Sequence, residues 1–290
     1  MEFLQVLIIG LGQGCVYGLL ALGFVMIYKA SELINFAQGD LMMLGAFSTF
    51  TYIVWFGLPY WLGVILAVVT MAIFGYLLDM TITRRMIGES PIATVVLTIS
   101  LGYVFRMIAI LIWGADYVSF TAPYAGVMLS YQGLHIGMEH IVVIVSTVLV
   151  SILLFLFFRY SNLGISMQAS SQNQLAAYYM GIPVKKVFSF VWSISAMLAV
   201  LAGVLLTPIL GMMYPHMGGI AITAFAAAII GGFGSLPGAF LGAIIIGCSE
   251  QLAANYLPSG FKESIAFLIM FLVLVIRPQG IFAQVYQKKV

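Results

Sequence analysis

Long apolar segments recur along the whole chain of 290 residues and restrict its fold more than any other feature. A helix needs about 20 apolar residues to cross a hydrocarbon core roughly 30 Å thick. Eight apolar segments are predicted spans. A ninth, shorter segment, 218–232, ends in Gly231 and Gly232, with Gly234 and Pro237 just after it, and either spans the membrane or re-enters it. The sequence therefore predicts an all-α polytopic membrane protein with eight or nine transmembrane helices. The eight longer segments are residues 3–28, 38–56, 60–83, 92–113, 139–158, 187–210, 236–253 and 262–277.

The composition indicates that the bilayer, not water, is the solvent of this chain. Only 7% of the residues are charged, 63% are hydrophobic, and the mean hydropathy is +1.15. A soluble domain carries roughly a quarter charged residues and about half apolar ones. So little polar surface cannot cover a globule of this size, which excludes a soluble domain. Lipid is the expected environment, and no nucleic-acid partner is expected.

The positive charges gather on one side of the predicted bundle. Short cytoplasmic loops of membrane proteins carry an excess of Lys and Arg. With 218–232 counted as a span, only Lys262 falls on the other side, and Arg106 lies within a span. This asymmetry favours nine crossings of one transmembrane domain, 1–290, with the N-terminus outside and the C-terminus in the cytoplasm. The residues on the cytoplasmic side are Lys29, Arg84, Arg85, Arg159, Lys185, Lys186, Arg277, Lys288 and Lys289.

Small residues indicate where the helices pack and whether the chain contains a repeat. Helices associate in lipid through close packing at glycine and similar residues. Two stripes of glycines repeat every four residues: Gly10, Gly14 and Gly18, and then Gly234, Gly238 and Gly242. Residues 39–47 and 234–240 also share a Gly-x-Leu pattern followed by Gly-Ala-Phe. This likeness indicates a possible parallel internal repeat, a common construction in transporters.

A polar stretch interrupts the apolar pattern between the first two spans. Asn35 and Gln38 have the spacing of a helix N-cap and its reciprocal partner, and Asp40 follows directly. Capping is one interpretation. The other is that Asn35, Gln38 and Asp40 line a polar opening at a helix break, since irregular backbone at membrane depth is tolerated only inside protein or beside a cavity. They are therefore candidates for the translocation pathway.

Arg106 is a basic residue in the middle of a predicted span, 92–113. An Arg at a helix centre costs about 2.5–3.5 kcal/mol on insertion scales and usually faces the bundle interior or water. Snorkelling towards the outer surface is the alternative, because the outer end of the span is only about two turns away. Either Asp116 or Glu250 is the expected carboxylate partner, and Arg106 joins the pathway candidates.

The longest predicted inner loop, 159–186, contains a short amphipathic helix. Ala169, Ala176, Ala177 and Met180 can share a narrow apolar face, and Gly181 with Pro183 ends the helix. A membrane-surface anchor should be rich in Lys and Arg. Because no basic residue occurs between Ser161 and Val184, docking against another protein is the favoured interpretation.

The chain lacks the motifs of an enzyme or a metal site. It contains no Gly-x-x-x-x-Gly-Lys-Ser/Thr phosphate loop, no His-Glu-x-x-His and no Gly-x-Ser-x-Gly elbow. Cys15 and Cys248 lie in apolar segments and imply neither a disulfide nor a metal. We therefore expect no catalytic residues, no metal and no cofactor in this chain.

At the inner loop the sequence resembles a known family. The pattern Gly-x(4)-Ala-x(6)-Ala-x(3)-Met-Gly-Ile, from Gly164 to Ile182, is similar to the ATPase-coupling loop of bacterial ABC importer permeases of the branched-chain amino acid (LivH) type. Three further segments, residues 34–41, 230–239 and 277–282, resemble the N-terminal signature, glycine-rich turn and closing motif of that family. The resemblance covers essentially the whole chain. This chain departs from the family at Gln168, Gln172 and Asn173, where charged residues are usual, and at Arg106, where an uncharged polar residue is usual.

The resemblance implies a permease subunit in the bacterial cytoplasmic (inner) membrane. Its implied partners are a second permease subunit, two cytoplasmic ATPases that hold ATP and Mg, and an external solute-binding protein. ATP-driven closure would move a loop helix at 166–181 as a lever. The implied substrate is a branched-chain or other hydrophobic amino acid. The implied ATPase-coupling residues are Gln172, Asn173, Leu175, Ala176, Ala177, Met180 and Gly181.

The sequence is also compatible with other functions. Related importers carry urea, amides, aromatic acids or other small solutes. A stand-alone channel or ion-coupled carrier would need several acids within the membrane. Only Asp40, Asp79 and Glu250 come near, all close to the ends of predicted spans. A membrane-embedded enzyme is the third alternative and lacks a clustered catalytic set.

Overall fold

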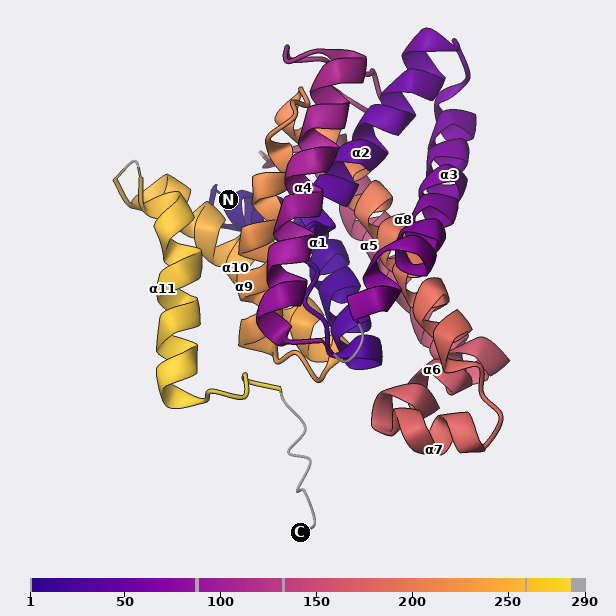
Figure 1. The fold of residues 1–290 in the computed structure, drawn as a ribbon. Helices are drawn as coiled ribbons and strands as arrows, with labels where there is room; N and C mark the ends of the chain where they lie inside the picture. The colour runs from indigo at the N-terminus through magenta and orange to yellow at the C-terminus, as the bar shows by residue number, and fades with distance from the viewer. Residues whose placement is uncertain (1, 87–88, 132–133, 259, 283–290) are drawn as a thin grey trace.

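The computed structural model describes residues 2–86, 89–131, 134–258 and 260–282. Two antiparallel strands and a series of helices follow one another along this part of the chain (Figure 1). The helices are α1 (Glu2–Ser31), α2 (Gln38–Phe50), α3 (Tyr60–Thr81), α4 (Pro91–Trp113), α5 (Met138–Tyr160), α6 (Asn162–Gln172), α7 (Gln174–Tyr179), α8 (Val184–Leu210), α9 (Ile220–Gly231), α10 (Leu236–Tyr256) and α11 (Phe261–Ile276). Short turns of other helix types are η1 (Thr51–Trp55), η2 (Thr83–Met86) and η3 (Met217–Gly219).

The architecture is that of an all-α polytopic membrane protein, as the sequence predicts. Within the described residues, six helices are long and apolar enough to cross a membrane: α1, α3, α4, α5, α8 and α10. The other three apolar segments form shorter helices, namely α2 continued by η1, η3 with α9, and α11. Every predicted apolar segment is thus helical, although three of them are too short to span the core as a single regular helix.

Helices α1 and α8 form the centre of the bundle. In the most apolar stretch of each helix, 72% of the α1 residues and 61% of the α8 residues are buried, against 11% for α5. Helix α1 packs on α10, α8 and α9, and α8 packs on α3 and α2. In Figure 1, α3 and α11 lie on opposite flanks, and α6 and α7 project from one end.

Glycines allow the closest helix contacts. A Cβ built on Gly10 would lie 2.8 Å from Cys248 Cα, and one on Gly14 would lie 2.9 Å from the Ala243 carbonyl oxygen. The first predicted stripe therefore packs on α10. In the second stripe, Gly238 and Gly242 face Gly231 of α9. The packing prediction fails at Gly234, because a Cβ there would meet no atom within 4 Å.

A β-hairpin that the sequence does not predict joins α4 to α5. Strands β1 (Met128–Tyr131) and β2 (Leu134–Gly137) pair antiparallel, with Met128 opposite Gly137. Val118, earlier in the same connection, forms a bridge with Met213 beyond the end of α8. The ends of α4 and α8 and the start of α5 thus gather on one end of the bundle, opposite α6 and α7.

Candidate functional site

The polar stretch after α1 is a break in helical structure deep inside the bundle. Helix α1 ends at Ser31, residues 32–37 are not helical, and α2 begins at Gln38. The side chain of Gln38 contacts Ser195, near the middle of α8. Asp40 lies against Gly102, the central residue of α4. Helix α2 therefore begins at the middle depth of the bundle, not at its surface.

Two buried amides hold this break in place. Asn35 Oδ1 accepts a hydrogen bond from the Ala37 amide at 3.1 Å, and Asn35 Nδ2 donates to Gln38 Oε1 at 3.2 Å. Gln38 Nε2 donates to the Ser195 carbonyl at 3.2 Å, and Ser195 Oγ donates to Gln38 Oε1 at 3.0 Å. Both amide residues are at most 1% exposed. Asn35 thus closes a local turn, but Gln38 reaches α8 and does not return to the Asn35 backbone as a reciprocal capping box requires.

Asp40 and Arg106 form an ion pair between α2 and α4. Arg106 Nε donates to Asp40 Oδ1 at 2.6 Å, and Arg106 Nη2 donates to Asp40 Oδ2 at 3.3 Å. Asp40 is 2% exposed, whereas the Arg106 side chain is 26% exposed and its guanidinium lies 5.2 Å from the centre of the Tyr103 ring. A two-pronged contact of this kind is the strongest geometry for an Arg and a carboxylate.

The predicted partners of Arg106 were wrong. Asp116 is exposed in the connection after α4. Glu250 is buried in α10, where it accepts a hydrogen bond from Tyr17 Oη at 2.7 Å and a longer one from Gln13 Nε2 at 3.4 Å. The acid that Arg106 meets is Asp40, because the helix break brings α2 against α4 at middle depth.

Glycines from two other segments surround the Asp40 carboxylate. A Cβ on Gly218 would lie 2.7 Å from Asp40 Oδ1, and one on Gly102 would overlap Asp40 Oδ2. A Cβ on Gly39 would overlap the carbonyl oxygen of Gly218. The first turn of α2 and the start of η3 and α9 therefore meet at Asp40. Helix N-termini carry partial positive charge, so a carboxylate is stabilised at this position.

The site combines a charged pair with a helix break, and both features are uncommon inside a membrane-spanning bundle. Ionisable side chains within a bundle are rare, pair with one another and commonly mark transport pathways. Here four candidate residues, Asn35, Gln38, Asp40 and Arg106, lie around one helix break. All four are pathway candidates from the sequence alone, but the sequence did not predict that Asp40 and Arg106 pair. The Gln13–Tyr17–Glu250 cluster between α1 and α10 was missed, because its members are distant in sequence.

The inner loop forms two helices, not one helix over 166–181. Asn173 ends α6 and caps α7, since its Oδ1 accepts a hydrogen bond from the Ala176 amide at 2.9 Å. Helix α7 ends before Gly181, which has a φ of +83°. Asn favours such caps over helix interiors because its side chain competes for backbone hydrogen bonds.

The predicted apolar face of this loop is divided between the chain's interior and its surface. Ala177 is 4% exposed and packs within its own chain, so it is not an accessible docking residue. Leu175, Tyr178, Tyr179 and Met180 are 67% to 83% exposed. The remaining coupling candidates, Gln172, Asn173, Ala176 and Gly181, are also exposed. We call the exposed set Leu175, Tyr178, Tyr179 and Met180 the α7 face.

Among the described residues, no group of three or more His, Cys, Asp or Glu side chains could hold a metal ion. The polar clusters described above are built from amides, hydroxyls, carboxylates and arginine side chains. Their chemistry is hydrogen bonding and charge pairing between helices.

A bundle of long apolar helices around a buried charged pair defines a multi-pass membrane protein with a polar interior. The sequence model of the family described as "Branched-chain amino acid transport system / permease component" matches residues 6–276. The chain belongs to this family.

Relatives in bacteria and archaea are similar over nearly their whole lengths. The high-affinity branched-chain amino acid transport system permease protein LivH of Salmonella typhimurium is 30% identical, over 100% of this chain and 98% of that protein. The corresponding protein BraD of Pseudomonas aeruginosa shows the same identity and coverage. The probable LivH permease of Methanocaldococcus jannaschii is 30% identical over 91% of this chain and 87% of its own length.

A solved structure shares the fold. A chain of PsaBC from Streptococcus pneumoniae, in complex with Fab, superposes with a TM-score of 0.50 at 14% identity, covering 95% of this chain and 91% of that chain. At this identity the likeness concerns the fold alone.

Proposed function

We propose that this chain is the permease subunit of an ATP-binding-cassette importer in a bacterial cytoplasmic membrane. The family match over residues 6–276 is the observation that carries this proposal. The chain has no phosphate-binding loop, so ATP and Mg would be held by two partner ATPases. A second permease subunit and an external solute-binding protein complete the assembly.

The substrate that we propose is a branched-chain or other hydrophobic amino acid. The support is that relatives covering the whole chain are named as branched-chain amino acid permeases. Arg106 and Asp40 add a charged pair at middle depth, where the charged ends of an amino acid would have to pass. Urea, amides, aromatic acids and other small solutes are the alternatives within the same kind of importer.

The proposed topology has nine crossings, with the N-terminus outside and the C-terminus inside. Basic residues at the end of α1, in the turn η2 after α3 and at the start of α8 lie at the same end of the bundle. The Arg84 guanidinium reaches the Lys185 carbonyl at 3.1 Å, and Gln174 of α7 donates to the Ala30 carbonyl, next to Lys29, at 3.3 Å. The positive-inside rule assigns this end to the cytoplasm.

Two of the proposed crossings are made by an irregular stretch followed by a short helix. Met213 bridges to Val118 at the outer end, Gly218 lies beside Asp40 at middle depth, and Phe233 packs on the Tyr28 ring at the inner end, with 5.1 Å between ring centres. The segment 213–233 therefore extends from one end to the other. Residues 32–55 cross in the opposite direction in the same manner. Broken helices that meet at the bilayer midplane are typical of transporter binding regions.

We propose that the translocation pathway passes this meeting point and that Asn35, Gln38, Asp40 and Arg106 line or control it. Irregular backbone at middle depth supports the proposal, because it is tolerated only where protein or a cavity surrounds it. The partial exposure of Arg106 beside a fully buried Asp40 gives the pair one accessible side.

The α7 face is the proposed docking surface for an ATPase subunit. Two tyrosines, a leucine and a methionine stand exposed on a short helix, and aromatic residues and Met are enriched at protein interfaces. The loop α6–α7 has no basic residue between Ser161 and Val184 that would favour an anionic lipid surface.

Assembly composition tests this function. The tagged chain, expressed with the ATPase, permease and binding-protein genes of its own organism, should co-purify with ATPase and second permease subunits. The isolated chain should hydrolyse no ATP. Recovery of the chain alone under conditions that preserve other importers, together with ion-driven uptake, would favour the stand-alone carrier instead.

A further inference from the structure

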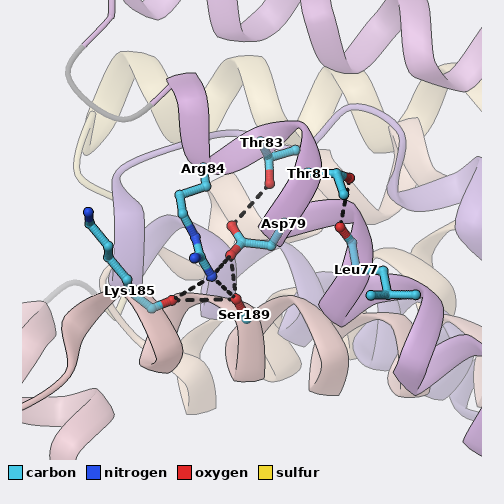
Figure 2. A network of polar contacts seen from close by, with 7 residues as sticks. All are labelled: Leu77, Asp79, Thr81, Thr83, Arg84, Lys185 and Ser189. Carbon is cyan, nitrogen blue, oxygen red and sulfur yellow. Dashed lines mark hydrogen bonds and ion pairs between the residues drawn. The ribbon is translucent and has the colours of Figure 1, made fainter.

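A buried carboxylate ties the end of α3 to the start of α8 (Figure 2). Asp79, in the last turn of α3, is 1% exposed. Its Oδ2 accepts a hydrogen bond from Ser189 Oγ at 2.7 Å, and its Oδ1 accepts one from Thr83 Oγ1 at 3.1 Å. Both carboxylate oxygens are therefore satisfied, as a buried charge requires.

Arg84 completes this cluster from the turn η2. Its Nη2 lies 3.4 Å from Asp79 Oδ2, donates to the Lys185 carbonyl at 3.1 Å and contacts Ser189 Oγ at 2.5 Å. One guanidinium nitrogen thus joins the carboxylate of α3 to the first two turns of α8, as the dashed lines in Figure 2 show. We call Asp79, Arg84 and Ser189 the α3–α8 clamp.

The clamp lies next to the inner loop. Only Met180, Gly181, Ile182 and Pro183 separate α7 from α8, and this linker is itself hydrogen-bonded. The Ile182 amide donates to the Ala177 carbonyl at 3.0 Å, and the Lys186 amide donates to the Pro183 carbonyl at 2.8 Å. Because this linker is short and hydrogen-bonded, we expect a displacement of α7 to move the first turn of α8 as well.

Beyond the clamp, α3 and α8 stay in close contact. Ser193 Oγ donates to the Ala72 carbonyl at 2.8 Å, and a Cβ on Gly75 would lie 2.7 Å from the Trp192 carbonyl oxygen. The Tyr76 and Phe190 rings pack edge to face, 5.6 Å apart. The two helices therefore form one packed unit, which the clamp closes at the end nearest the inner loop.

We propose that Asp79 and Arg84 are positioning residues that make α3 move together with α8 when the inner loop is displaced. This inference rests on the proposed function, in which the α7 face meets an ATPase. Without the clamp, displacement of α7 would bend the first turns of α8 and leave α3 in place. Loss of the α3–α8 clamp would therefore lower the amount of substrate transported per ATP hydrolysed.

Arg84→Gln tests the proposal against Arg85→Gln, a neighbouring exposed arginine whose side chain makes no hydrogen bond or ion pair with another residue that the structure describes. Each variant is purified in the full importer and placed in proteoliposomes, where uptake of labelled leucine and ATP hydrolysis are measured together. Arg84→Gln should lower the leucine transported per ATP about twofold to fivefold, the effect of losing a coupling of about 0.5–1 kcal/mol. Arg85→Gln should match the wild type. Equal transport per ATP in all three would overturn the proposal.

Two further variants separate positioning from folding. Arg84→Lys keeps a cation that can reach Asp79 and should restore part of the transport per ATP. Ser189→Ala removes one contact of the clamp without removing a charge and should give a smaller loss. If Arg84→Gln fails to assemble, an unchanged ratio in Ser189→Ala overturns the proposal.

A distance measurement on the isolated chain keeps this inference separate from the proposed function. Spin labels at the exposed residues Met80 and Lys186 report the distance between α3 and α8. The wild type should give one narrow distribution, Arg84→Gln a broader one, and Arg85→Gln the wild-type width. Identical widths in Arg84→Gln and the wild type would overturn the clamp, even where the importer transports leucine. A wild-type importer that neither binds ATPases nor transports would count against the proposed function alone.

Discussion

Arg106 Nε lies 2.6 Å from Asp40 Oδ1, and this contact joins the start of a broken helix to the middle of α4. A buried carboxylate without a partner carries a large desolvation cost. The pair therefore stabilises the break at which α2 begins.

Removing one member of this pair should destabilise the subunit more than removing both. Asp40→Asn and Arg106→Gln each leave one uncompensated charge, at a cost of about 1–3 kcal/mol. This is less than for a fully buried pair, because Arg106 is partly exposed. The double variant leaves no charge and should recover part of the loss. Thermal unfolding in detergent checks this, with exposed Asp116→Asn as control. Losses that simply add in the double variant would contradict a direct pairing.

The glycine beside the Asp40 carboxylate should be intolerant of any side chain. Gly218→Ala places a methyl group 2.7 Å from Asp40 Oδ1, and overpacking of this kind costs about 1–3 kcal/mol. Gly219→Ala is the matched control, because a Cβ there meets nothing within 4 Å. Transport and thermal stability should fall in the first variant only. Equal behaviour of the two variants would mean that the carboxylate is not confined as the structure shows.

Ala176 and Ala177 should respond differently to the same substitution. Ala177→Trp inserts a large ring into a buried position and should lower the thermal stability of the subunit itself. Ala176→Trp changes an exposed position beside the α7 face and should leave the isolated subunit stable while reducing co-purification of ATPases. Normal ATPase recovery in Ala176→Trp and in Tyr179→Ala would show that the α7 face is not the docking surface.

The proposed topology predicts which loops are accessible from each side. In a chain with Cys15 and Cys248 replaced by serine, a cysteine at Ser171 should react with a membrane-impermeant thiol reagent only from the cytoplasm. A cysteine at Ala125, in the connection between α4 and α5, should react only from outside. The proposed topology places one crossing, α5, between these two positions. Labelling of both from the same side would contradict it.

Hydropathy was enough to predict the helices, because the need for internal backbone hydrogen bonds in lipid allows an apolar segment few other structures. It also placed Arg106 within a span, but it left open whether the side chain faces the interior or snorkels towards the outer surface. The partner of Arg106 could not be predicted, since spacing along one sequence does not reveal which helices are neighbours. Asp40 became its partner only because α2 begins at middle depth.

The inner loop shows a second limit of sequence patterns. The alanines and Met180 have helical spacing, but that spacing does not reveal which positions pack inside the chain. Asn173 divides the loop into α6 and α7 by capping, and the division turns Ala177 inward. The pairing of strands β1 and β2 and the Gln13–Tyr17–Glu250 cluster are marked by no local motif.

ATP-dependent uptake tests the proposed importer function most directly. Proteoliposomes are prepared with this chain, the second permease and both ATPases, and labelled leucine is added with the binding protein. The proposed function predicts uptake that requires ATP on the ATPase side, requires the binding protein, and disappears when this chain is omitted. Uptake by this chain alone, driven by an ion gradient and indifferent to ATP, would contradict it.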